Sequence, residues 1–159
     1  MELKGDLTLE NIPLNKAAIF FINLNEVIPC LPYLVTWKPI DKNTVSASFK
    51  ADIGSISVLE YISRVNADVI IKLIKYDEIN NSIEYSFDGK AAGIKYTGQI
   101  LLKLFNINDG KGTKILWNAS VDIGKLLGML SKFLNINDII NGIINDVINN
   151  IKQCIENKK

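Results

Sequence analysis

The spacing of apolar residues changes once along the chain, and this change constrains the fold more than any other feature of the sequence. Up to about residue 123, apolar residues recur at every second position in one segment after another. After Gly124 they recur about every 3.6 positions. The first period is typical of strands that bury one face, and the second is typical of an amphipathic helix. A run of strands followed by a long helix predicts an α+β fold, whose antiparallel sheet has one solvent-exposed face.

The alternating segments are expected to form six or seven strands, interrupted once by helices. Asn15 and Asn25 are candidate N-caps of two short helices after the first strand, because asparagine side chains accept hydrogen bonds from the first N–H groups of a helix. Residues 54–66 fit neither period. The expected strands are residues 2–10, 33–40, 44–53, 67–76, 82–89, 93–106 and 113–123.

The residues after Gly124 predict one long amphipathic helix, with an apolar stripe from Leu126 to Ile155. Its opposite face is rich in asparagine, and the helix can kink or divide at Asn135–Asp138. It is the only expected element large enough to cover the apolar face of the sheet. We therefore expect residues 1–159 to form a single helix-grip domain. In this fold a curved antiparallel sheet wraps around the C-terminal helix, and a cavity remains between them unless bulky side chains fill it.

The charge balance and the lack of histidine exclude several classes of function. The chain has 18 lysine and arginine residues, 17 acidic residues and a formal net charge of +1. Without histidine it lacks the usual general base and the commonest metal ligand, so a Ser-His-Asp triad, a Cys-His dyad and a histidine-containing zinc site are excluded. Non-specific nucleic-acid binding needs clustered lysine and arginine. We therefore expect no catalytic residue, no metal site, no cofactor and no nucleic-acid partner.

Cys30 and Cys154 are the only cysteines, and neither belongs to a Cys-x-x-Cys pair that would indicate a zinc or thioredoxin-like site. Two buried thiols are the expected state. A disulfide stays open as the alternative, because some intracellular proteins of thermophiles contain them. The first residues lack the apolar segment of a signal peptide, and no run of about 18 apolar residues could span a membrane. The sequence therefore predicts a soluble, cytoplasmic protein.

Four motifs carry a family resemblance. They are Met1–Gly5, the Phe21–Pro32 segment that ends in Leu-Pro, the glycine-containing turn Lys90–Gly98, and Gly112–Lys114. In this order they resemble the G-subunit family of carbon monoxide dehydrogenase, within the START-like (polyketide-cyclase-like) superfamily. Tyr33 stands where that family usually has a glycine.

The resemblance implies a fold that encloses a hydrophobic cavity. Proteins of this superfamily bind lipids, sterols, polyketides or quinones, and the G-subunit family is associated with servicing molybdenum hydroxylases. It therefore implies a hydrophobic small molecule of the lipid or quinone class as partner, with a redox enzyme or a membrane surface as a further candidate. Two alternatives stay open. One is a polyketide-cyclase-like enzyme with Tyr85 and Tyr96 as candidate general acids, and the other is an assembly subunit of a dehydrogenase that binds no ligand.

The candidate cavity lining consists of apolar and aromatic residues, most of which the alternation places on the inner faces of strands. Aromatic rings offer broad apolar contact, and the polar tips of tyrosine and tryptophan can orient a ligand. The same residues would also suit an ordinary core. Access is expected near residues 15–30, 53–62 and 89–94. The candidate lining residues are Phe21, Phe49, Leu73, Tyr85, Phe87, Tyr96, Trp117, Leu130 and Phe133.

Other polar and glycine residues of the strands have simpler interpretations. Asp68, Glu84 and Asp88 are expected to be solvated surface groups rather than a pair for acid–base chemistry. Gly89, Gly93 and Gly98 precede or interrupt a strand and do not precede a helix, so they indicate a turn and a bend or bulge rather than a phosphate-binding loop.

Overall fold

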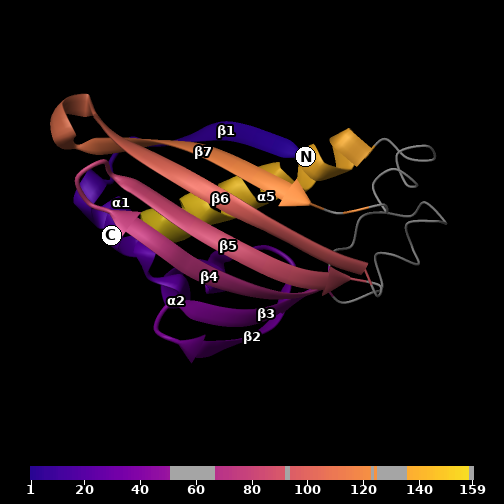
Figure 1. Cartoon of the computed structure of the whole chain (residues 1–159). Helices are drawn as coiled ribbons and strands as arrows, with labels where there is room; N and C mark the ends of the chain where they lie inside the picture. The colour runs from indigo at the N-terminus through magenta and orange to yellow at the C-terminus, as the bar shows by residue number, and fades with distance from the viewer. Residues whose placement is uncertain (51–66, 92–93, 123, 125–135, 158–159) are drawn as a thin grey trace.

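Seven antiparallel strands form one curved sheet in the computed structural model, which describes residues 1–50, 67–91, 94–122, 124 and 136–157 (Figure 1). The order across the sheet is β1-β7-β6-β5-β4-β3-β2, so the first two strands of the chain form its two edges. This sheet confirms the predicted α+β, START-like helix-grip architecture. The strands are β1 (Glu2–Leu9), β2 (Leu34–Asp41), β3 (Thr44–Phe49), β4 (Ala67–Asp77), β5 (Ser82–Ala91), β6 (Ile94–Ile107) and β7 (Gly112–Asp122).

The helices lie in three places along the described chain. Short helices connect β1 to β2, as predicted, and the long helix α5 crosses the sheet and packs on β1 and η1 (Figure 1). A further short turn, η2, joins β6 to β7, where Asn108, Asp109 and Gly110 all have positive φ. The helices are α1 (Leu14–Ile22), α2 (Leu24–Val27), η1 (Ile28–Cys30), η2 (Asn108–Gly110) and α5 (Ile136–Asn157).

The predicted N-caps of the short helices are wrong. Helix α1 begins after Pro13, whose carbonyl accepts the N–H of Ala17 at 3.0 Å, so Asn15 lies inside the helix. Helix α2 likewise begins after Asn23, which makes no side-chain capping bond, and Asn25 lies within it. Pro13 occupies the N-cap position of α1 with an extended ψ of 154°, and a proline keeps the residue before it out of the helical region, so α1 cannot begin earlier.

The predicted strands agree with the observed ones to within a few residues wherever the structure describes the chain. The segment 54–66 and the end of the predicted 44–53 strand lie outside the described residues. So does the first part of the predicted long helix, since α5 is described from Ile136. None of the helices in the described part of the chain is long and apolar enough to cross a membrane.

The dry core lies where the short helices pack on the inner face of the sheet. Helix α1 contacts β6 and β7, and α2 contacts β3. Leu9, Ile83 and Ile115 are almost completely shielded from solvent there. Burial decreases along β5, from Ile83 through the buried Tyr85 to the half-buried Phe87. One part of the inner face is therefore closely packed core, and another part is only half-covered.

Candidate ligand-binding site

The predicted lining residues that the structure describes divide into a buried group and a half-buried group. Phe21 and Tyr85 are buried in the core, whereas Leu130 and Phe133 lie outside the described residues. The remaining residues are half-buried and pack beside the core on the inner face of the sheet. Each comes from a different one of the adjacent strands β3 to β7. We call this set the inner apolar surface; it consists of Phe49, Leu73, Phe87, Tyr96 and Trp117.

Tyr85 fastens the sheet to helix α1. Its hydroxyl donates a hydrogen bond to the backbone carbonyl of Phe21, in the last turn of α1. Carbonyls in the last turn of a helix lack partners within the helix, so the phenol satisfies a group that would otherwise be buried and unpaired. Burial raises the pKa of Tyr85. The hydroxyl is therefore protonated and already used in the core.

Glycines create space for the rings of the inner apolar surface. A Cβ on Gly98 would lie 2.3 Å from Cζ of Phe87, and a Cβ on Gly89 would lie 2.2 Å from Cζ of Tyr96. The strand register pairs Phe87 with Gly98 and Tyr96 with Gly89. Each ring therefore lies across its neighbouring strand, instead of standing upright between the sheet and α5. The predicted bend or bulge does not describe this role of the two glycines.

Tyr96 is the accessible polar group of this surface. Its ring packs at a tilt against Phe87, with 6.3 Å between the ring centroids. Partial burial and the negative charge of Asp68 raise the pKa of Tyr96, so its hydroxyl is a donor at neutral pH rather than a base. Phenol groups of this kind can orient a carbonyl or hydroxyl of an otherwise apolar molecule.

Trp117 contributes a second polar group. Its indole lies over Gly5 of the paired strand β1, where an added Cβ would be 2.6 Å from Cζ2. The Nε1 atom is buried and has no hydrogen-bond acceptor in the described structure. An unpaired buried N–H costs about 1–3 kcal/mol, so an acceptor at this position would be stabilising.

Helix α5 presents a second apolar surface that is also only half-covered. Among the α5 stripe residues whose burial the structure describes, most are half-buried, and only Ile155 near the C-terminal end is fully buried. The sequence predicted this stripe as a packed face and did not indicate it as a binding surface. The half-buried stripe residues are Ile140, Ile143, Ile144, Val147, Ile148 and Ile151.

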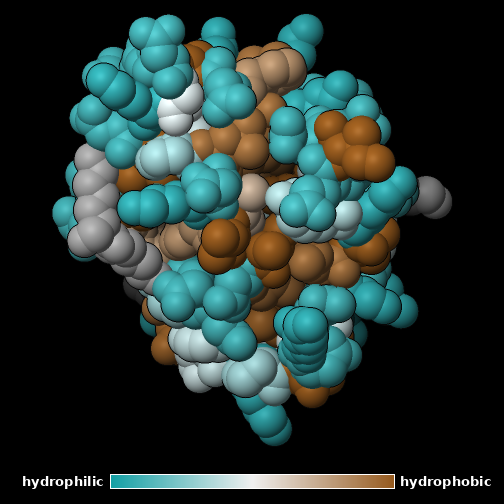
Figure 2. Space-filling view, turned by 90° about the vertical axis from the view of Figure 1, so that its left-hand side faces the viewer, coloured by the Kyte–Doolittle hydropathy of each residue, from teal (hydrophilic) through white to brown (hydrophobic). Residues whose placement is uncertain are grey.

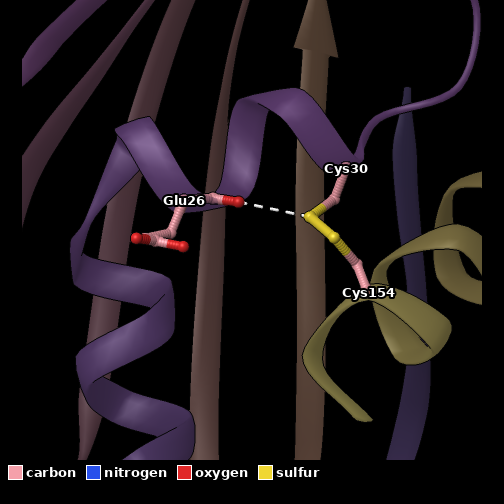
Figure 3. Close-up of a disulfide and its surroundings, with 3 residues drawn as sticks. All are labelled: Glu26, Cys30 and Cys154. Atoms are coloured by element: carbon pink, nitrogen blue, oxygen red, sulfur yellow. Dashed lines mark hydrogen bonds between the residues drawn. A yellow bond between two sulfur atoms is a disulfide. The ribbon is translucent and has the colours of Figure 1, made fainter. Parts of the chain in front are cut away.

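Cys30 and Cys154 form a disulfide, which corrects the expectation of two free thiols (Figure 3). Their Cα atoms are 5.9 Å apart, within the usual range for a disulfide. The bond joins η1 to the C-terminal part of α5 across 124 positions of sequence. The sequence left this disulfide open as an alternative but could not decide for it, because the pairing depends on α5 returning to the short helices.

The outer face of the sheet has an open hollow of about 330 Å³, whose lining also includes Phe87 and Gly98. Its polar side chains alternate with the core-facing ones and belong to Ser86, Asp88, Thr97, Gln99, Ser120 and Asp122. The predicted surface positions of Asp68 and Asp88 are confirmed, and Glu84 is half-buried. No group of three or more potential ligands that could hold a metal occurs among the residues described.

Apolar side chains also reach the surface at the end of the molecule that carries α1 and the C-terminus. Figure 2 shows them there between hydrophilic groups, and Ile19 of α1 is 63% exposed. Apolar atoms contribute about 55–60% of the exposed surface of a typical folded protein, so these side chains do not by themselves mark a binding face.

Comparison with known proteins supports the same architecture. The sequence model of the carbon monoxide dehydrogenase G-subunit (CoxG) family matches residues 10–156. No curated protein matches the chain.

Several solved structures have the same fold at low sequence identity. A conserved protein from Geobacillus kaustophilus has a TM-score of 0.72 at 14% identity, over 99% of this chain and 96% of its own. A START superfamily protein from Mycobacterium smegmatis has a TM-score of 0.69 at 6% identity, over 99% of both chains. A protein from Thermus thermophilus has a TM-score of 0.62 at 11% identity, over 100% of this chain and 99% of its own.

Proposed function

The chain belongs to the CoxG family of carbon monoxide dehydrogenase, and we propose that it binds a hydrophobic small molecule of the lipid or quinone class between the inner face of its sheet and α5. The observation that carries the proposal is the incomplete burial of both apolar surfaces there. Phe87 and Ile144 are half-buried, whereas Ile83 and Ile115 in the same fold are dry core. An apolar ligand would cover the remaining area and gain about 25 cal/mol per Å².

The polar groups of this site favour a ligand that carries an oxygen. The hydroxyl of Tyr96 and the Nε1–H of Trp117 are both donors. A carbonyl oxygen accepts from such groups, so a quinone or an acyl chain with a carbonyl suits the site better than a pure hydrocarbon.

The proposed role is that of a carrier without catalysis of its own. The hydroxyl of Tyr85 already donates its proton to a hydrogen bond in the core, and the raised pKa of Tyr96 makes its phenol a weaker acid, so neither is a ready general acid. The family name links the chain to carbon monoxide dehydrogenase. We propose that the bound molecule is passed to a redox enzyme of the molybdenum hydroxylase type, directly or from a membrane surface.

We also propose that residues 1–159 form a single domain and that the protein is cytoplasmic. In the cytosol of an organism that is not a hyperthermophile, a disulfide such as Cys30–Cys154 is usually transient or redox-sensing. Alkylation of the protein in intact cells, followed by mass measurement, reports whether the two cysteines are paired in their native compartment.

The function is tested by measuring the binding of menadione and lauric acid to variants of two adjacent residues in α5. Ile144→Glu places a charge in the proposed site and is expected to weaken binding about tenfold or more. Asn145→Glu places the same charge on the exposed face of the helix and should bind like the wild type. Ile144→Phe tests the same space without a charge, since it fills the site and should also weaken binding.

Two results would contradict the proposal. One is the absence of binding by the wild type together with an organic extract of the native protein that contains no apolar molecule; this would favour the assembly role. The other is equal binding by Ile144→Glu, Ile144→Phe and Asn145→Glu. Circular dichroism of each variant separates a loss of binding from a loss of folding.

A further inference from the structure

The segment Cys30–Tyr33 contacts helix α5 at two points. We call these two contacts together the latch. Cys30 is bonded to Cys154, and the hydroxyl of Tyr33 donates to the carboxylate of Asp146. These two positions of α5 are about two turns apart. The hydrogen bond to Asp146 raises the pKa of Tyr33, so the Tyr33 hydroxyl is protonated at neutral pH and can donate this bond.

The latch sits where α5 changes from closely packed to half-covered. Ile155, beside Cys154, is 5% exposed, whereas Ile144 and the stripe residues on either side of it are half-buried. Because fewer buried contacts hold the earlier turns, the bond at Cys154 is a main restraint on how far α5 can move from the sheet.

The sulfur of Cys30 has a suitable neighbour in the reduced state as well. Its Sγ lies 3.2 Å from the backbone oxygen of Glu26, one helical turn earlier (Figure 3). A disulfide sulfur carries no hydrogen, so this contact becomes a hydrogen bond only when Cys30 is a thiol. Reduction therefore leaves a buried thiol whose S–H has an acceptor.

We propose that the disulfide is a reversible redox latch that controls how fast the ligand exchanges; the ligand part rests on the proposed function. A dithiol reductant attacks the half-buried Sγ of Cys154 as a thiolate, and the S–S bond breaks with Cys30 as the leaving thiolate. The second thiol of the reductant then displaces Cys154. Two electrons and two protons pass to the protein, and the reductant becomes a disulfide. Cys30 then donates to Glu26, and α5 keeps only the Tyr33–Asp146 contact of the latch.

The test compares oxidised and dithiothreitol-reduced protein under native conditions. Backbone amides in the last turns of α5 should exchange hydrogen about tenfold faster after reduction, because local opening becomes less costly. Release of bound anilinonaphthalene sulfonate should accelerate by a similar factor, and reoxidation should restore both rates. The Cys30→Ser, Cys154→Ser double variant should show the fast rates with or without the reductant.

Three results would overturn the inference. The first is a disulfide that dithiothreitol leaves intact in the folded protein. The second is a reduced protein whose α5 exchanges hydrogen as slowly as that of the oxidised protein. The third is faster exchange of α5 without faster release of the dye. If the dye, menadione and lauric acid fail to bind in either state, the proposed function fails together with the inference, and the exchange rates of α5 show whether the mechanical part still holds.

Discussion

The hydroxyl of Tyr85 in the middle of β5 donates a hydrogen bond to the carbonyl of Phe21 at the end of α1. This bond joins the only described buried phenol of the sheet to the helix that covers the core. Tyr85→Phe should lower the free energy of unfolding by about 1–3 kcal/mol, because the carbonyl of Phe21 remains buried and loses its donor. Urea denaturation measures the change.

Tyr76→Phe is the matched control, since Tyr76 is only half-buried in the neighbouring strand β4. It should change the free energy of unfolding by no more than about 0.5 kcal/mol. Equal stability of the Tyr85→Phe and Tyr76→Phe variants would show that the bond to Phe21 contributes nothing.

The raised pKa of Tyr85 predicts a loss of stability at alkaline pH. Below about pH 10 the phenol is protonated in both the folded and the unfolded chain, so it adds no pH dependence. Above this pH the unfolded chain loses the proton and the folded chain keeps it, so stability falls by up to about 1.4 kcal/mol per pH unit. Between pH 10 and 11, Tyr85→Phe should lose less stability than the wild type by about 1 kcal/mol. The same slope in both proteins would contradict a raised pKa of Tyr85.

Alanine substitutions at Gly98 and Gly142 should change the free energy of unfolding in opposite directions. At Gly98 the new Cβ would meet the Phe87 ring at 2.3 Å and the backbone oxygen of Ser120 at 2.6 Å, so a loss of about 1–3 kcal/mol is expected. At Gly142 nothing lies within 4 Å, and a gain of up to about 1 kcal/mol is expected in the interior of α5. A stable Gly98→Ala variant would contradict the packing of Phe87 over this glycine.

Gly89→Ala should affect binding more than stability. The nearest atoms to its new Cβ all belong to the side chain of Tyr96, which can move. The ring would then turn into the space between the sheet and α5. We expect about tenfold weaker binding of menadione with a stability loss near 1 kcal/mol. Unchanged binding, measured by calorimetry, would place Tyr96 outside the site.

Removing the disulfide should destabilise the fold by about 2–5 kcal/mol, because the bond closes a loop of 124 positions. The Cys30→Ser, Cys154→Ser double variant measures this against the oxidised wild type. Adding dithiothreitol should lower the melting temperature of the wild type and leave that of the double variant unchanged. Equal melting temperatures before and after complete reduction of the wild type would contradict a stabilising role.

The two hydrophobic periods of the sequence were enough to predict the strands and α5, whereas the short helices were predicted from candidate N-caps. The alternation of apolar and polar residues is a property of each strand alone. It therefore predicted that Phe87 and Tyr96 lie on the inner face, without information on the neighbouring strands. The N-caps at Asn15 and Asn25 were wrong because Pro13 already starts the first helix, and a cap preference is only a local signal.

The features that give the site its shape depend on register and on distant contacts. Phe87 lies over Gly98 only because β5 and β6 pair at those positions, and Cys30 meets Cys154 only because α5 returns to η1. The available signal for this packing was a glycine on the inner face of one strand and an aromatic residue on the inner face of the next. This signal can be used only when the register of the two strands is known. The degree of burial of Ile144 cannot be predicted from the apolar stripe alone.

Ligand binding between the sheet and α5 is tested most directly by nuclear magnetic resonance of the isoleucine δ1 methyl groups while menadione is added. The chain supplies its own controls, because isoleucines occur in both the half-buried stripe and the dry core. We predict shifts and contacts to the ligand at Ile140, Ile143 and Ile144, and none at Ile83 and Ile115. A titration in which the stripe methyls do not move would contradict the proposal that the protein holds an apolar ligand between its sheet and α5.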